Sequence, residues 1–221
     1  MNAKYGAMAN HRKGSGGLRR PREEARRARN ELYRQHILQA AERVFSERGF
    51  ENAKLQEISA QAGLSMGTIY SIFASKDELF LALLEERGQE LRDLAREVAV
   101  TPGSARAALE RLIEAYIGYF VQHPTFLTMH LKLGHSWVLA PTAEGEGQVR
   151  IWQEIHESQA DIFRRGIAEG AFVEEDPEFL AKLFSAMDQV VLSQWAAEGM
   201  KAGRAELIAR MRNATQRAFY R

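Results

Sequence analysis

The sequence predicts an all-α protein. Apolar side chains recur at helical spacing almost without interruption from about residue 31 onward. No stretch alternates polar and apolar residues over a strand-like length between turn signals, which argues against a sheet. Short Gly, Pro and Ser clusters separate the helical stretches and divide them into about nine helices. The 221 residues are enough for one large or two small domains.

The first three predicted helices are defined by specific start and stop signals. The first apolar stripe stops at Gly49. Two short helices follow, over residues 55–62 and 66–73, and they meet at Gly63, whose permissive backbone suits a tight corner. Ser65 predicts an N-cap for the second of them. Two short helices across such a turn are typical of a helix-turn-helix, whose second helix fits the major groove of DNA.

The remaining helices follow a capping box, in which Ser75 precedes Glu78 by three residues. This box opens a long fourth helix. Five more helices are predicted after it: one that follows residues 101–104, one from Pro124 that includes Trp137, one that follows residues 141–147 and ends near Gly170, one over residues 177–198, and one after Gly203.

The net charge of +1 hides an asymmetry along the chain. Residues 1–76 carry 14 Lys and Arg against seven Asp and Glu, whereas residues 77–221 carry 16 against 22. A basic front part on an acidic remainder indicates that only the front part meets a polyanion. A chance scatter of charge is the plainer alternative.

These patterns divide the chain into three parts. Residues 1–30 form a cationic arm, whose glycines and lack of an apolar period predict no regular structure. Composition leaves open whether the arm follows DNA phosphates or is a solvated tail. We expect residues 31–78 to form a helix-turn-helix DNA-binding domain and residues 79–221 to form a second helical domain. The expected roles of this second domain are ligand binding, which a family resemblance in residues 34–80 implies, and dimerisation, which the apolar arc of its eighth helix also supports.

Candidate DNA contacts surround the turn. The hydroxyl groups of Thr68 and Ser71 suit base edges, and Gly67 lets the backbone approach them. Tyr70 offers its phenol to a phosphate, unless it belongs to the core. Lys76 adds a cation to the free N–H groups of a helix start, although solvated surface charge is the common fate of lysine. The complete set is Lys54, Ser65, Met66, Gly67, Thr68, Tyr70, Ser71 and Lys76.

A longer pattern in the same region resembles the N-terminal domain of the TetR family of transcriptional regulators. The pattern comprises residues 37–45 and 47–50, Glu57-Ile58-Ser59, Ala62-Gly63-Leu64-Ser65, Gly67-Thr68-Ile69-Tyr70, Phe73 and Ser75-Lys76-Asp77-Glu78-Leu79. The resemblance covers about residues 34–80 and is weak beyond them. It implies a homodimeric DNA-binding protein, usually a repressor, that is released by a small ligand bound in its C-terminal helices.

Three positions differ from the family pattern or vary within it. Lys54 stands where the family usually has a threonine that caps the second helix, and a lysine cannot cap. Ile72 stands where the family often has a histidine that contacts phosphate or base. Met66 occupies a variable base-reading position, so the family does not supply the operator sequence.

The resemblance implies an effector pocket among the fifth to eighth helices. Two stripes that mix rings with polar groups suit such a pocket, namely Phe126, His130, Leu133 and Trp137, and Trp152, His156, Gln159 and Phe163. Further candidates are Tyr116, Phe120, Met187 and Val191. Ordinary core packing is the alternative for each of them. The set favours a small, largely apolar or aromatic effector.

The predicted eighth helix is apolar over too broad an arc to face one core alone. Together with the ninth helix it predicts a homodimer interface, which would place two recognition helices on a palindromic operator. Asp188 lies on the eighth helix. Its carboxylate could select a cationic ligand, but pairing across the dimer or contact with water is favoured, because unpaired buried charge is costly.

Other classes of function find little support. Cysteine is absent, which excludes a disulfide framework and fits a cytoplasmic protein. No apolar run reaches the length of a membrane span, and the N-terminus does not read as a secretory signal. His156-Glu157 lacks a second histidine at zinc-site spacing, so we expect no enzyme, cofactor or metal. The main alternative is a constitutive or architectural DNA-binding protein with no effector.

Overall fold

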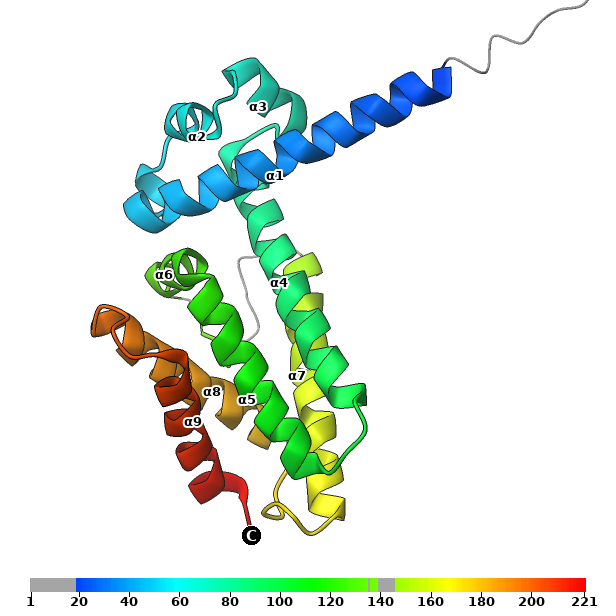
Figure 1. The fold of residues 1–221 in the computed structure, drawn as a ribbon, viewed down its shortest axis with the longest axis vertical. Coiled ribbons are helices and arrows are strands. Elements are labelled where there is room, and N and C mark those ends of the chain that lie inside the picture. Colours follow the sequence, from blue (N-terminus) through cyan, green and yellow to red (C-terminus); the bar gives the residue numbers. More distant parts are fainter. Residues whose placement is uncertain (1–18, 135, 139–145) are drawn as a thin grey trace, which may run out of the picture.

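The all-α prediction is confirmed. The computed structural model describes residues 19–134, 136–138 and 146–221. Within these ranges the chain forms nine helices, which Figure 1 shows as a small head of three helices on a larger helical body. They are α1 (Arg19–Asn52), α2 (Leu55–Ala62), α3 (Met66–Ile72), α4 (Lys76–Val100), α5 (Ala105–Gln122), α6 (Pro124–Lys132), α7 (Glu146–Ala168), α8 (Pro177–Ala197) and α9 (Arg204–Phe219).

Helix α1 is longer than predicted. The prediction of an unstructured arm over residues 1–30 is wrong for residues 19–30, which form its first turns, while residues 1–18 lie outside the described part. The physical reason is composition: residues 22–30 are mainly Arg, Glu and Ala, which favour helix, and the arm's glycines lie further upstream. Every side chain from residue 22 to residue 32 is exposed, and this half of α1 projects beyond the head (Figure 1).

The second half of α1 carries the core of the head. Ile37 and Phe45 of α1, Ile58 of α2 and Ile69 of α3 are completely buried. Gly49 interrupts the helix with a φ of 74°, a conformation that glycine adopts without strain. This kink directs the chain toward α2, so that α2 and α3 pack across α1.

The predicted helix starts are confirmed at atomic level. Ser75 Oγ accepts a hydrogen bond from the Glu78 backbone N–H at 3.0 Å, while the Glu78 carboxylate accepts one from the Ala74 N–H at 2.6 Å. At the starts of α5 and α8, Ser104 Oγ accepts a hydrogen bond from the Ala107 N–H and Asp176 Oδ1 accepts one from the Glu178 N–H. These caps satisfy the free N–H groups of each helix and define where it begins.

Helix α4 connects the head to the body and packs along α5 and α7 (Figure 1). Helix α6 lies against α1, directly below the head. The prediction that α6 includes Trp137 is wrong: α6 ends at Lys132, because Gly134 takes a φ of 67° just beyond it. Trp137 lies in a bend after the helix. No helix of the described ranges has the length and apolar character that a membrane span requires.

Candidate functional site

The turn between α2 and α3 is fixed by hydrogen bonds. Gly63 ends α2 in the left-handed conformation, with φ 66° and ψ 28°. The N–H groups of Gly63 and Leu64 donate to the carbonyls of Ala60 and Ser59. Ser59 Oγ donates to the Leu64 carbonyl at 2.6 Å. The turn therefore holds α3 at a defined angle to α2.

Helix α3 begins at the predicted cap. Ser65 Oγ accepts from the Thr68 N–H at 3.1 Å and lies 2.9 Å from Thr68 Oγ1. Ser71 Oγ donates to the Thr68 carbonyl at 2.7 Å. These bonds orient both hydroxyl groups, and each hydroxyl oxygen keeps acceptor capacity for a further partner.

The outer face of α3 is open to solvent. Ile69 anchors the helix in the head core, whereas Ser65, Gly67 and Ser71 are exposed and Met66 and Thr68 are half-buried. Tyr70 is 54% exposed, so the core alternative for this residue does not hold. The predicted base-reading residues thus lie on one short helix whose outer face carries small and polar groups.

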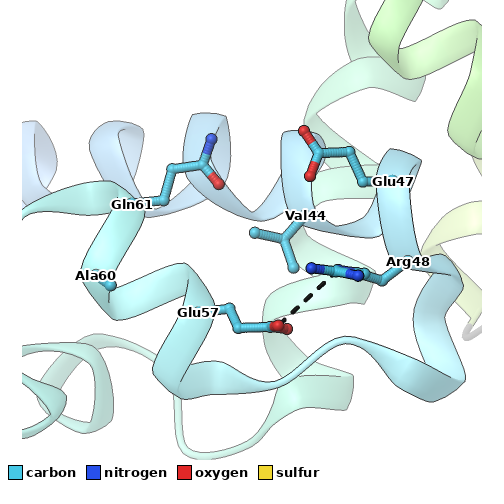
Figure 2. Close-up of a pocket in the computed structure, with 6 residues that line it drawn as sticks. All are labelled: Val44, Glu47, Arg48, Glu57, Ala60 and Gln61. Atoms are coloured by element: carbon cyan, nitrogen blue, oxygen red, sulfur yellow. Dashed lines mark ion pairs between the residues drawn. The ribbon is translucent and has the colours of Figure 1, made fainter.

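Lys54 precedes α2 and is exposed. Its side chain makes no cap, as expected for lysine, but Glu57 accepts a hydrogen bond from the Lys54 backbone N–H at 3.2 Å. Glu57 also pairs with Arg48 at 3.9 Å across a surface hollow between α1 and α2 (Figure 2). The hollow has no aromatic lining residue, so it does not resemble the predicted effector pocket. It lies within the head.

Lys76 differs from its prediction. Its Nζ donates to the carbonyls of Phe50, Glu51 and Ala53 at 2.8, 3.2 and 3.3 Å, and lies 4.5 Å from the centre of the Phe50 ring. The ammonium group is therefore occupied by carbonyls at the C-terminal end of α1 and just beyond it, and a phosphate contact through it is not supported. These hydrogen bonds could not be predicted from the sequence, because the acceptor carbonyls lie 23 to 26 residues before Lys76.

Lys76→Ala is expected to lower the free energy of unfolding by about 2 kcal/mol, because three carbonyls lose a charged donor. Urea denaturation measures this loss. Lys54→Ala is the matched control, since this exposed lysine makes no cap, and its stability should change by less than about 0.5 kcal/mol. An unchanged stability of Lys76→Ala, with a flatter salt dependence of DNA binding, would restore the phosphate contact.

Gly67→Ala should separate stability from recognition. A Cβ at this position would lie 3.7 Å from Ser65 Oγ, an ordinary contact, so α3 gains up to about 1 kcal/mol of stability. The same methyl group keeps the backbone away from base edges, and we expect operator affinity to fall about tenfold. Paired melting and anisotropy titrations test this. Gly147→Ala in α7, where a Cβ meets open space, should leave affinity unchanged.

The head is joined to the body by a polar network. Arg87 of α4 donates to Glu42 of α1 at 2.8 Å and to Glu90 at 2.9 Å, and Tyr119 of α5 donates to Glu90 at 2.5 Å. Lys132, in the last turn of α6, donates to the Ser46 carbonyl of α1. The role of Lys132 could not be predicted from the sequence, because its partner is set only by the packing of α6 on α1. A displacement of α6 or α4 would therefore reach α1 directly.

The predicted effector residues lie in the body, where a buried polar chain links α5, α7 and α8. Ser185 Oγ donates to Gln159 Oε1 at 3.0 Å, and Gln159 Nε2 donates to the Tyr116 hydroxyl at 3.4 Å. Burial raises the pKa of Tyr116 far above its ordinary value, so the phenol keeps its proton. Ser185 was missed, although it lies three residues before Asp188 and so shares a helix face with it.

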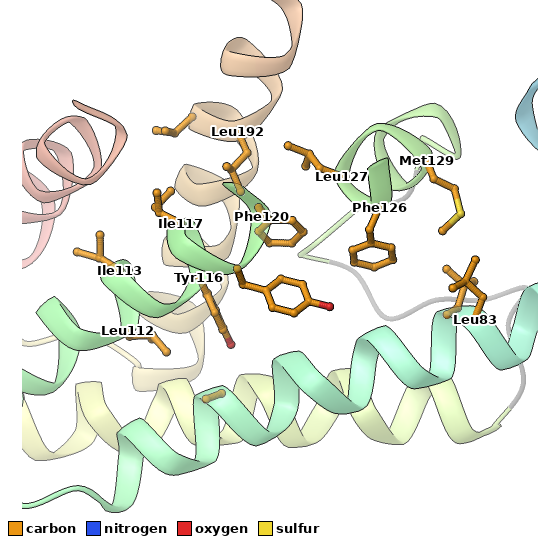
Figure 3. Close-up of a cluster of buried hydrophobic side chains, with 14 of the residues drawn as sticks. Leu83, Leu112, Ile113, Tyr116, Ile117, Phe120, Phe126, Leu127, Met129 and Leu192 are labelled. Carbon is orange, nitrogen blue, oxygen red and sulfur yellow. The ribbon is translucent and has the colours of Figure 1, made fainter. Parts of the chain in front are cut away.

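Aromatic rings lie next to these hydrogen-bonded side chains, on the side of α6. Phe120 of α5 stacks on Trp137 with 5.0 Å between ring centres and lies 6.2 Å from Phe126. His130 lies between Phe126 and Trp137, at 5.8 and 5.6 Å. Figure 3 shows Tyr116, Phe120 and Phe126 in one buried cluster. The structure therefore brings these candidates together, although Trp137 arrives from a bend and not from α6.

The stripe on α7 meets this cluster at one end and the core at the other. Trp152 Nε1 donates to the Trp137 carbonyl at 3.4 Å, and the Trp152 ring lies 4.1 Å from that of His156. Burial lowers the pKa of His156, and Lys182 lowers it further, whereas a contact with the Trp152 carbonyl opposes both. Phe163, in contrast, packs at 5.0 Å against Phe219, deep in the core.

The remaining effector candidates and Asp188 differ in how deeply they are buried. Leu133 and Met187 are half-buried against the core, and Val191 is buried. Asp188 is only 2% exposed, and its Oδ1 has no hydrogen-bond partner among the described residues. Burial raises its pKa to about 7. The favoured expectation, contact with water or with a dimer partner, is wrong because this carboxylate is enclosed within the protomer.

Helix α8 leaves apolar side chains uncovered on its outer face. Phe179 is 53% exposed, Leu183 is 36% exposed and Val190 is 65% exposed. They follow positions i, i+4 and i+11 and so form one stripe, which we call the α8 stripe. Exposed apolar stripes of this kind mark interaction surfaces in soluble proteins.

Fold and site together define a helix-turn-helix protein with a helical body. Residues 37–83 match the model of the bacterial regulatory proteins of the tetR family. The HTH-type transcriptional repressor NicS of Pseudomonas putida is 32% identical over 96 residues, which are 43% of this chain and 45% of NicS. The match thus spans less than half of that relative. The predicted resemblance of the N-terminal region to the tetR family is confirmed.

Solved structures share the fold over most of the chain. A protein from Saccharomonospora viridis, solved in complex with choline, aligns with a TM-score of 0.69 and 21% identity over 86% of this chain and 99% of its own. FadR from Bacillus subtilis, solved in complex with stearoyl-CoA, aligns with a TM-score of 0.67 and 18% identity over 81% and 94%. At these identities the likeness concerns the fold alone.

Proposed function

We propose that this protein is a transcriptional regulator, most simply a repressor, that binds a palindromic operator as a homodimer in the cytoplasm. A small, largely apolar or aromatic effector then binds among α5 to α8 and releases it from DNA. The observation that carries the proposal is the exposed outer face of α3, with Gly67, Tyr70 and Ser71 held over a buried Ile69. Such a helix end suits the major groove.

The body supports the effector part of the proposal. Tyr116, Phe120, Trp137, Trp152 and Gln159 supply rings and a few polar groups in one region, as ligand pockets do. The two fold neighbours were solved with chemically unlike molecules, choline and stearoyl-CoA. The fold therefore does not select the ligand, and the side chains of this chain must do so.

The polar contacts between the head and the body support the proposal that an effector controls DNA binding. Lys132 of α6 donates a hydrogen bond to a carbonyl of α1. Arg87 of α4 donates to Glu42 of α1 and to Glu90 of its own helix. An effector that favours a different position of α6 or α4 would change the separation of the two heads in a dimer. Coupling free energies of about 1–3 kcal/mol are typical of such systems and change affinity about 5–150-fold.

The experiment is an operator titration. Labelled fragments from the DNA flanking the gene, with and without an inverted repeat, are titrated by anisotropy at several salt concentrations. We expect tight, salt-dependent binding of the inverted repeat and weaker binding of a scrambled control. Equal binding of both fragments would contradict an operator-specific regulator. Specific binding that no bound effector alters would favour the constitutive alternative.

A further inference from the structure

We propose that the effector is a protonated amine, whose ammonium group pairs with the Asp188 carboxylate inside the body. This inference rests on the proposed function and names the chemical class of its effector. It starts from a carboxylate that the described part of the protein encloses but does not satisfy. Asp188 Oδ1 is buried without a hydrogen-bond partner, and no Lys, Arg or His of the described residues forms an ion pair with this side chain.

A carboxylate in this position needs a partner. Removing an ionised carboxylate from water without pairing it is strongly unfavourable, and native proteins pair such groups or leave them protonated. Burial alone raises the pKa of Asp188 to about 7. The group is therefore poised near neutrality, where a cationic ligand stabilises its ionised form.

Neither the dimer nor the solvent can supply the partner. The apolar residues open to a second copy on α8 are Phe179, Leu183 and Val190, whereas Asp188 is 2% exposed. Its own face of α8 holds Phe184 one turn before it and Val191 and Trp195 after it, and all three are buried. The carboxylate thus faces the interior in which the effector candidates lie.

The neighbouring polar groups leave this role to Asp188. Ser185 donates to Gln159, and Gln159 donates to the Tyr116 hydroxyl. These groups satisfy one another and are neutral, so none of them neutralises a carboxylate. Asp188 acts electrostatically on Tyr116, which places the carboxylate near the phenol end of this chain. The Tyr116 proton remains available to an acceptor atom of the same ligand.

The apolar surroundings suit the rest of an organic amine. Tyr116 and Phe184 lie 6.4 Å apart, ring centre to ring centre, and Phe120 stacks on Trp137 nearby on α5. Aromatic faces attract cations as well as hydrocarbon. A ligand with one ammonium group and an apolar body would meet both kinds of contact, whereas a carboxylate ligand would be repelled by Asp188.

The test compares ligands that share a body and differ in charge. The probes are 2-phenylethylamine, 2-phenylethanol and phenylacetate, with hexylamine, hexanol and hexanoate as a second set. Binding to the full-length protein at pH 8 is followed by calorimetry and tryptophan fluorescence, since Trp137, Trp152 and Trp195 all lie in the body. We expect each amine to bind at least tenfold more tightly than its alcohol, and the acids to bind most weakly.

Two variants test whether the Asp188 carboxylate causes the preference for amines. Asp188→Asn keeps the shape and removes the charge, and should abolish the tenfold advantage of the amines while the alcohols change less than threefold. Glu178→Gln, at an exposed acid of the same helix, should leave every dissociation constant unchanged. An Asp188→Asn protein that still prefers amines would overturn the proposal. So would a wild-type protein that prefers an alcohol or an acid, or that binds none of the six.

Operator binding is measured in parallel, so that the two proposals can fail separately. Amine binding that requires Asp188, in a protein that binds no inverted repeat, would refute the proposed function and leave the cation site standing. Specific operator binding without any amine preference would refute the cation site and leave the regulator standing.

Discussion

Val190→Glu is expected to convert the proposed homodimer to monomers and to weaken operator binding by about 10²-fold or more. Val190 is the most exposed member of the α8 stripe, and a homodimer would bury it against a second copy. A glutamate buried there without a partner destabilises the interface. A monomer loses the second head, and joining two heads typically raises affinity by about 10²–10⁴-fold.

Light scattering coupled to size-exclusion chromatography gives the mass, and anisotropy with an inverted repeat gives the affinity. Val100→Glu is the matched control, because Val100 is also exposed, at 74%, but lies at the end of α4 away from α8 (Figure 1). It should remain dimeric with unchanged affinity. A Val190→Glu protein that stays dimeric and binds normally would remove the α8 stripe from the interface.

Asp188→Asn is expected to stabilise the protein at pH 8 by about 4 kcal/mol, with little change at pH 4. The aspartate titrates near pH 4 in the unfolded chain and at about 7 in the folded protein. Between these values the folded state holds a proton that the unfolded state lacks. The free energy of unfolding therefore falls as pH rises from 4 to 7, by about 1.4 kcal/mol per pH unit. Asparagine has no such proton to lose.

Urea denaturation of both proteins at pH 4, 6 and 8 measures the difference. Asp188 acts electrostatically on Tyr116, and Tyr116 stays neutral over the whole range because burial raises its pKa. Glu178→Gln should follow the wild-type curve, since its carboxyl group is exposed. Parallel curves for wild type and Asp188→Asn would mean that Asp188 is ionised and satisfied in the folded protein.

Local signals predicted the head well. Gly63, Ser65 and Ser75 act through backbone groups within a few residues, so their roles as corner and caps could be derived from the sequence. Tyr70 is exposed, as its predicted phosphate contact requires. The bounds of α2 and of the start of α3 agree with the predicted ranges for the same reason.

Contacts between distant segments could not be predicted. Lys76 and Lys132 find their acceptors on α1 only because three helices pack there, and charge alone suggested a phosphate for Lys76. The start of α1 was missed because, with residues 1–30 taken as one segment, the glycines at positions 14, 16 and 17 outweigh the helix-forming residues 22–30. The environment of Asp188 depends on which side of α8 faces the interior. Because α8 carries apolar residues on both sides, the sequence does not show which side that is.

Two lysines that donate hydrogen bonds to the end of α1 limit how this protein can be re-engineered. Lys76 belongs to α4 and Lys132 to α6, yet both hold carbonyls of the head, between Ser46 and Ala53. A chimaera that grafts the head of another tetR-like protein at the start of α4 would leave Lys132 facing a foreign helix end. If the proposed function holds, directing this protein to a new promoter is better done by changing the outer face of α3, which lies in the head and away from Lys132.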